Sequence, residues 1–158
     1  MIEQYKTLDD MAEVIKEYEL ILMRPTLHLS NPTLYRKRDA GKKEVIIKGV
    51  RVRDYFLSED HKWVKPHNQM GLSFSASFFN LSTAFRMKKR RNPAKNLNIY
   101  WVLDQADIPS GLKFIPDEED SEHYFLTVTE VMLLSALVSK LKRLARRMSV
   151  IRNGSKVL

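Results

Sequence analysis

The stretch at residues 71–77 (GLSFSAS) constrains the fold more than any other part of the sequence. Its three serines alternate with apolar residues, and a period of two predicts a β-strand with one apolar face and one hydroxyl face. The apolar face is expected to pack in a core. The other face would present Ser73 and Ser75 to orient a ligand. The same spacing is also typical of an edge strand whose serines are simply solvated.

The rest of the chain fits one globular domain of the α+β class. Its 158 residues are 44% hydrophobic and 29% charged, which favours a folded chain over a disordered one. Cysteine is absent, which excludes disulfides and thiolate metal sites and favours a reducing, cytoplasmic location. The four histidines follow no metal-ligand spacing, so we expect no metal. No apolar run reaches the length of a membrane span, and the first residues lack a signal-peptide core.

Charge is distributed unevenly along the chain, whose formal net charge is +8. Residues 36–70, 71–100 and 131–158 are basic, while residues 101–130 are acidic. Segments of opposite sign can neutralise each other in the fold. The remaining positive charge predicts attraction to a polyanion or to an acidic protein partner.

Periodicity and turn residues predict helices and strands along most of the chain. Helices are expected over residues 7–23, 78–91 and from Thr127 or Thr129 to residue 148, and strands over residues 33–38, 44–47, 50–53, 71–77, 97–103, 112–115 and 123–128. An acidic loop is expected at residues 116–122. The single domain would thus comprise an N-terminal helix 7–23, a core over residues 30–148 and a short basic tail at 149–158.

The last predicted helix is amphipathic. Its apolar stripe consists of Leu134, Leu137, Leu141, Leu144 and Met148. We expect this stripe to pack on a sheet, and a membrane surface is the alternative use of a basic amphipathic helix.

Common catalytic motifs are missing from the sequence. The five glycines are isolated, so neither the P-loop nor the dinucleotide pattern occurs, and no serine stands in a nucleophile elbow. What remains is an ordered series of short pieces, namely residues 33–36 (TLYR), 71–73 (GLS), 108–113 (IPSGLK), and 123–124 (HY) with Met132 beyond.

This series resembles the ADP-ribosyltransferase-like toxins that type VI secretion systems deliver between bacteria. The matching pieces span about residues 30–135 in the same order and at similar separations. The resemblance implies a mixed split β-sheet with flanking helices and a cleft for NAD, which is the substrate. It also implies a growth-inhibiting transferase that acts in the bacterial cytoplasm and is restrained by an immunity protein or antitoxin.

The resemblance assigns roles to four residues near the predicted cleft. Arg36 would be the first-strand arginine that pairs with the phosphates of NAD, and a guanidinium suits that anion. Tyr35 beside it would contribute to cofactor binding. Ser73 and Ser75 would orient the ribose on the nicotinamide side. The residues themselves leave open that Arg36 belongs to a solvated basic strand.

Three further roles are implied for the late part of the chain. His123 and Tyr124 would lie beside the cleft, where a ring can stack on nicotinamide and a polar atom can hold a ribose. A late glutamate would stabilise the oxocarbenium-like transition state. Glu130 and Glu122 are the available acids, and neither stands in an acid-x-acid arrangement. The alternative for His123 is a structural histidine whose hydrogen bonds are made within the fold. The alternative for Glu130 is an acid in the first turn of the last helix.

Two other function classes compete with this one. The basic run at residues 88–91 and the basic last helix favour a nucleic-acid-binding or RNA-cleaving toxin, with His61 or His67 in its acid–base pair. The third hypothesis is a catalytically inactive relative that binds a protein partner.

Overall fold

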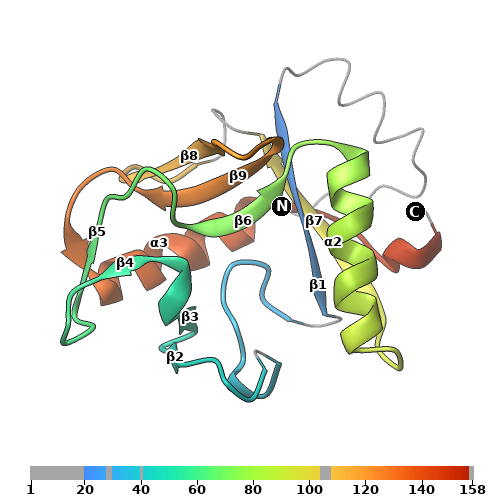
Figure 1. Cartoon of the computed structure of the whole chain (residues 1–158), viewed down its shortest axis with the longest axis horizontal. Coiled ribbons are helices and arrows are strands. Elements are labelled where there is room, and N and C mark those ends of the chain that lie inside the picture. Colours follow the sequence, from blue (N-terminus) through green and yellow to red (C-terminus); the bar gives the residue numbers. More distant parts are fainter. Residues whose placement is uncertain (1–19, 28–29, 40, 104–107, 157–158) are drawn as a thin grey trace.

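The computed structural model describes residues 20–27, 30–39, 41–103 and 108–156 (Figure 1). The helices are α2 (Phe78–Arg91) and α3 (Leu134–Arg147), with short 3-10 turns η1 (Lys37–Asp39), η2 (Val52–Asp54) and η3 (Gly154–Lys156). The strands are β1 (Ile21–Leu27), β2 (Ile46–Ile47), β3 (Val50–Arg51), β4 (Phe56–Leu57), β5 (Trp63–Lys65), β6 (Leu72–Ser75), β7 (Leu97–Leu103), β8 (Leu112–Asp117), β9 (Asp120–Val128), β10 (Met132–Leu133) and β11 (Ser149–Ile151).

The main sheet has six strands in the order β11-β7-β1-β6-β9-β8. Strand β1 pairs with β7 along its whole length, from Ile21 opposite Leu103 to Leu27 opposite Leu97. With β6 it pairs only at Met23, which lies opposite Ser75. The sheet therefore splits where β6 leaves β1, and the second half of β1 has a strand neighbour on one side only.

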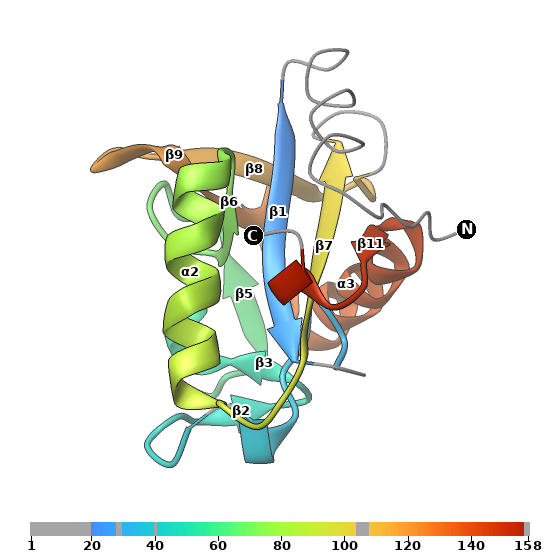
Figure 2. The same ribbon diagram turned by 90° about the vertical axis from the view of Figure 1, so that its right-hand side faces the viewer.

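Helices α2 and α3 cover opposite faces of this sheet (Figure 2). The face toward α2 buries Met23, Ile99 and Trp101 against Leu81 and Phe85 of the helix. The face toward α3 buries a larger core. Helix α3 contributes Leu134, Leu137, Leu141 and Leu144, and Met148 follows it; each is at most 2% exposed. At about 1.5–3 kcal/mol for each fully buried side chain, this stripe is a main source of stability.

Two small sheets complete the fold. Strands β10, β5 and β4 form one, in that order, and β2 and β3 form a hairpin. The hairpin turn is at Lys48 and Gly49, which have φ angles of 54° and 90°. Positive φ at both central residues is the requirement of a type I′ turn, which glycine meets without strain. In the described part of the chain, no helix is long and apolar enough to cross a membrane.

The structure confirms the α+β class and several predicted elements. These are the helix at residues 78–91, the strands at 97–103, 112–115 and 123–128, the 50–51 part of a hairpin, and the buried stripe of α3. The expected mixed sheet is not found, because every pairing among the described residues is antiparallel.

The predicted helix at residues 7–23 is wrong at its end, since residues 21–23 belong to β1. Residues 7–19 lie outside the described part. Every residue of β1 is buried, because helices cover the sheet on both faces. A strand covered on both sides forms a continuous apolar run, and periodicity does not distinguish such a run from a buried helix. Pro25 is tolerated because its half of β1 has a strand on one side only.

Four other segments also differ from prediction. Residues 33–36 are not a strand, because the Asn31 side-chain oxygen accepts hydrogen bonds from the amides of Thr33 and Leu34 and holds a turn there. Helix α3 begins at Leu134 rather than at Thr127 or Thr129, since Thr127 is part of β9. The acidic residues 116–122 form the tight end of the β8–β9 hairpin, and part of the predicted tail forms β11, at the sheet edge.

Candidate functional site

Arg24 occupies the point at which the main sheet splits. It lies on β1 and is only 8% exposed. Its Nε donates to the Pro32 carbonyl at 2.9 Å, its Nη1 to the Ser73 carbonyl at 2.9 Å, and its Nη2 to the Tyr35 hydroxyl at 2.7 Å. These bonds tie the segment after β1 to the serine strand β6. All three partners are uncharged, so the hydrogen bonds leave a buried positive charge uncompensated.

Three cations surround the ring of Tyr35. The guanidinium carbons of Arg24 and Arg51 lie 5.4 Å and 4.7 Å from its centroid, and the Lys88 ammonium lies at 5.8 Å. An aromatic face attracts cations, which explains how they assemble here. Arg51 also pairs with Asp54 at 2.8 Å. The cluster therefore keeps a net positive charge, contributed mainly by Arg24 and Lys88.

Lys88 is the most perturbed charge of this cluster. Burial, followed by the charges of Arg24 and Arg51, lowers the pKa of Lys88 to about 7, while Asp39 acts in the opposite direction. Within the described residues the Lys88 ammonium lies over the Tyr35 ring and is attracted by the charge of Asp39, but no carboxylate or carbonyl accepts a hydrogen bond from it. A half-buried amine without an acceptor is a group that a bound anion would stabilise.

A small hollow lies among these side chains, and we call it the cationic hollow. It has a volume of about 20 Å³ and is lined by Arg24, Thr26, Leu27, Ser30, Asn31, Leu34, Tyr35, Arg36, Asp39 and Lys88. The hydroxyl oxygens of Thr26 and Ser30 are buried and have no hydrogen-bond partner among the described residues. Buried polar groups are rarely left unpaired. Unpaired hydroxyl donors and uncompensated cations around one hollow are the chemistry that binds an oxyanion such as phosphate.

Arg36, the predicted phosphate-binding residue, lines the hollow but is already paired. Its Nε lies 2.5 Å from a carboxylate oxygen of Asp39, and its side chain is 37% exposed. Burial raises the pKa of Asp39, but the hydrogen bond and charge of Arg36, with the charge of Lys95, lower it overall. Arg24, and not Arg36, is the arginine that lies on a strand next to the serine strand β6. Tyr35, which the resemblance assigns to cofactor binding, lies in the cationic cluster.

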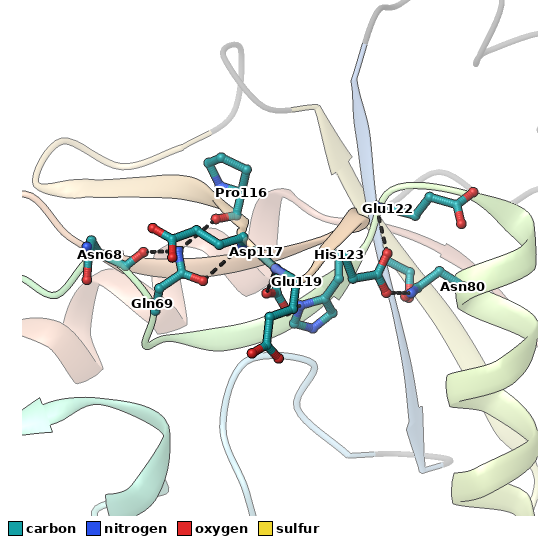
Figure 3. A network of polar contacts seen from close by, with 11 residues as sticks. Asn68, Gln69, Asn80, Pro116, Asp117, Glu119, Glu122 and His123 are labelled. Carbon is teal, nitrogen blue, oxygen red and sulfur yellow. Dashed lines mark hydrogen bonds and ion pairs between the residues drawn. The ribbon is translucent and has the colours of Figure 1, made fainter.

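The two predicted serines have different roles. The Ser75 side chain is buried, and its hydroxyl donates to the Asn80 side-chain oxygen at 2.6 Å. Asn80 in turn donates to Asp120 at 2.8 Å (Figure 3). Ser75 therefore connects β6 to the start of α2 and to the β8–β9 hairpin. Ser73 is half-buried and lies nearer the hollow, where its carbonyl accepts the bond from Arg24.

His123 and Tyr124 do not face the same side of the sheet. His123 lies opposite Ser75 and Tyr124 opposite Phe74, so they point to alternate faces. Tyr124 packs against the core beneath α3. The Nδ1 atom of His123 lies 2.9 Å from a carboxylate oxygen of Asp117 (Figure 3). Of the two, only His123 shares a face with Ser75, and Asp117 fixes the orientation of its ring.

Glu130 lies apart from these residues. It is exposed in the segment between β9 and β10. His123 is near the start of β9, and Val128, at the other end, is about 17 Å away along the strand. Glu122 is closer to the serine strand, because its carbonyl accepts a hydrogen bond from the Ala76 amide at 2.8 Å.

Sequence reasoning missed Arg24 and Asp117. The signal for Arg24 was an isolated charge in the apolar run ILMRPTL, which a buried strand admits only for a reason. Lys88 was part of the basic run 88–91, which the sequence left open as a solvated helix end or a phosphate-contacting patch. In the described residues, no group of three or more potential ligands could hold a metal ion. Comparisons with protein-family models, curated proteins and solved structures found no match to this chain.

Proposed function

We propose that this chain is a growth-inhibiting toxin of the ADP-ribosyltransferase-like type, and that the phosphates of NAD bind at the cationic hollow. One observation carries the proposal. Arg24 and Lys88 hold uncompensated positive charge beside the buried, unpaired hydroxyls of Thr26 and Ser30. That charge would stabilise a bound phosphate. When no phosphate is bound, keeping the charge buried costs free energy.

The geometry limits how such a ligand binds. The hollow has room for about one water-sized group. A phosphate would therefore place one or two oxygens inside, against Lys88 and the unused N–H groups of Arg24, and leave the rest of NAD outside. Ser73, whose carbonyl touches Arg24, marks the direction in which the ribose and nicotinamide would extend along β6.

The proposed reaction breaks the bond between nicotinamide and ribose and transfers ADP-ribose to an acceptor. The cationic sugar that develops needs a nearby anion. Asp120 and Glu122 lie next to the end of β6, whereas Glu130 lies beyond the far end of β9. We therefore assign the acid to Asp120 or Glu122. His123, held by Asp117, would accept the proton of the attacking acceptor. An immunity protein and a cytoplasmic site of action belong to the same proposal.

The test is growth and NAD content after induction in bacteria. The wild-type chain should stop growth and lower cellular NAD. Lys88→Met should abolish both effects, because it removes the ammonium that faces the phosphate. Lys89→Met is the matched control, since the Lys89 ammonium donates to the Lys95 carbonyl away from the hollow. Growth arrest with unchanged NAD would contradict the proposal, as would equal toxicity of the Lys88 variant.

A nucleic-acid target is the second candidate, and one observation favours it. Helix α3 contains no acidic residue, and its Lys142, Arg143 and Arg146 are all exposed. This basic face would bind phosphates of RNA with a strong dependence on salt. RNA binding that weakens steeply with salt and is lost in Arg143→Glu, together with unchanged NAD in arrested cells, would favour this function. Binding of NAD without its consumption would instead indicate an inactive relative that acts through a protein partner.

A further inference from the structure

The small sheet β10-β5-β4 presents one apolar face to solvent. Register places Met132 opposite Val64, and Leu57 also opposite Val64, on the inner side. Leu133 lies opposite Trp63, and Phe56 opposite Lys65, on the outer side. Side chains of a strand alternate between its faces, so Phe56, Trp63 and Leu133 share the outer face.

These outer side chains are large and exposed. Phe56 is 43% exposed, Trp63 is 44% and Leu133 is 46%, and Val131, two residues before Leu133, is 57%. We call these four residues the apolar sheet face. Four of the seven large exposed hydrophobic side chains in the described part belong to it. Contiguous apolar surface of this kind on a folded domain marks an interaction site more often than isolated exposed residues do.

The edge of this face carries two exposed lysines. The Lys65 ammonium lies 5.3 Å from the centroid of the Phe56 ring, and Lys62, next to Trp63, is exposed. Two acids of the same turn, Glu59 and Asp60, are also exposed. Asp60 is engaged locally, because it accepts hydrogen bonds from the Ser58 hydroxyl and the Lys62 amide. Neither lysine forms an ion pair with a carboxylate within the described residues, although the Ser58 hydrogen bond and, to a lesser extent, the charge of Lys62 lower the pKa of Asp60.

The arrangement of these side chains favours one class of binding partner over the others. A second copy of this chain would bring the lysines of one face toward those of the other, which is unfavourable. Single-stranded RNA stacks successive bases on several aromatic rings, of which this face has only Trp63 and Phe56. Here the Lys65 ammonium covers one side of Phe56, the His67 ring lies edge-on to it at 5.6 Å, and Leu133 and Val131 cannot stack on bases. An apolar protein segment flanked by carboxylates would bury the exposed hydrophobic side chains and pair with the lysines.

We propose that the apolar sheet face is a docking site for an acidic partner protein, which packs an apolar side chain on Trp63 and Leu133 and places carboxylates against Lys62 and Lys65. None of these residues lines the cationic hollow. The docking site therefore does not depend on the proposed function, and each can fail without the other.

Intrinsic fluorescence tests the proposal, because the chain has two tryptophans in different environments. Trp101 is 5% exposed and Trp63 is 44% exposed, so a ligand at this face shifts mainly the emission of Trp63. The probes are a synthetic amphipathic helix of leucine and glutamate, the same helix with lysine in place of glutamate, and a polyuridine oligonucleotide. We expect the acidic helix to bind with a blue shift, and the other two to leave the spectrum unchanged.

Variants locate the binding. Leu133→Ala and Lys65→Gln should each weaken binding of the acidic helix, by about tenfold for Leu133→Ala as expected at the centre of an interface. Phe79→Ala is the matched control, since Phe79 is 73% exposed on α2, away from this face. Absence of binding by the acidic helix, equal binding of the lysine helix, a blue shift with polyuridine, or a dimer that Leu133→Ala dissociates would each overturn the proposal.

Discussion

Replacing Lys88 by methionine should stabilise the free protein while abolishing its binding of phosphate ligands. Methionine keeps most of the aliphatic length of lysine, so packing against Tyr35 is largely retained. It removes a charge whose pKa is lowered to about 7 by burial and by Arg24 and Arg51. At about 1.4 kcal/mol per pKa unit, and allowing for relaxation, the free energy of unfolding should rise on the order of 2–4 kcal/mol near pH 6.

The difference should depend on pH in one direction. Near pH 6, Lys88 is protonated in both the folded and the unfolded chain, so the wild type bears the whole cost of the buried charge. Above about pH 7 the folded chain releases this proton, whereas the unfolded chain keeps it until near its ordinary pKa of 10.5. The wild type therefore gains stability as the pH rises, and the advantage of Lys88→Met should shrink markedly between about pH 6 and pH 9.

Urea unfolding of both proteins at the two pH values measures this difference, with Lys89→Met as the control for loss of one positive charge. A bound phosphate would favour protonated Lys88, so phosphate affinity of the wild type should fall above about pH 7 and show no such dependence in Lys88→Met. The reasoning would be refuted if Lys88→Met were less stable than the wild type near pH 6, or if the difference did not change with pH.

Three further predictions concern the fold. Leu137→Asp places a carboxylate at a fully buried position of α3 and loses about 1.5–3 kcal/mol of apolar burial besides, so circular dichroism should show an unfolded chain; a soluble variant with normal melting would contradict this. Gly71→Ala should cost about 1–3 kcal/mol in urea unfolding, because its methyl group would overlap the Leu126 carbonyl, and unchanged stability would count against the β6–β9 pairing. Ser77→Ala should cost about 1 kcal/mol by the same measurement, since the Ser77 hydroxyl accepts a hydrogen bond from the Asn80 amide and caps α2. An unchanged midpoint of urea unfolding would show that this cap contributes nothing.

Elements with one buried face were the easiest to predict from the sequence. The stripe of α3 follows a single period, because packing on one side imposes it. The alternation of β6 was recognised because its two faces differ in chemistry, although Ser75 on the hydroxyl face is buried as well. Strand β1 follows none, since α2 and α3 cover it on both faces. Its neighbour β7 was still recognised, because it is rich in β-branched and aromatic residues and contains no proline.

The candidate site was only partly predictable for a related reason. Tyr35 and Ser73 were singled out by short motifs, and both contact Arg24. The motif with Tyr35 also pointed to Arg36, but local sequence does not show that Asp39 neutralises that side chain. Lys88 and Lys89 are adjacent in a uniform basic run, and only tertiary packing decides that the first faces the hollow while the second binds the Lys95 carbonyl.

Calorimetric titration of the purified chain with NAD, near pH 6.5, is the most direct test of the cationic hollow as a phosphate site. Nicotinamide riboside, which has no phosphate, is the matched ligand. We predict that the wild type binds NAD and ADP-ribose but not the riboside, and that Lys88→Met binds none of the three while Lys89→Met behaves as the wild type. Equal binding of NAD and the riboside, or NAD binding that survives Lys88→Met unchanged, would contradict the account.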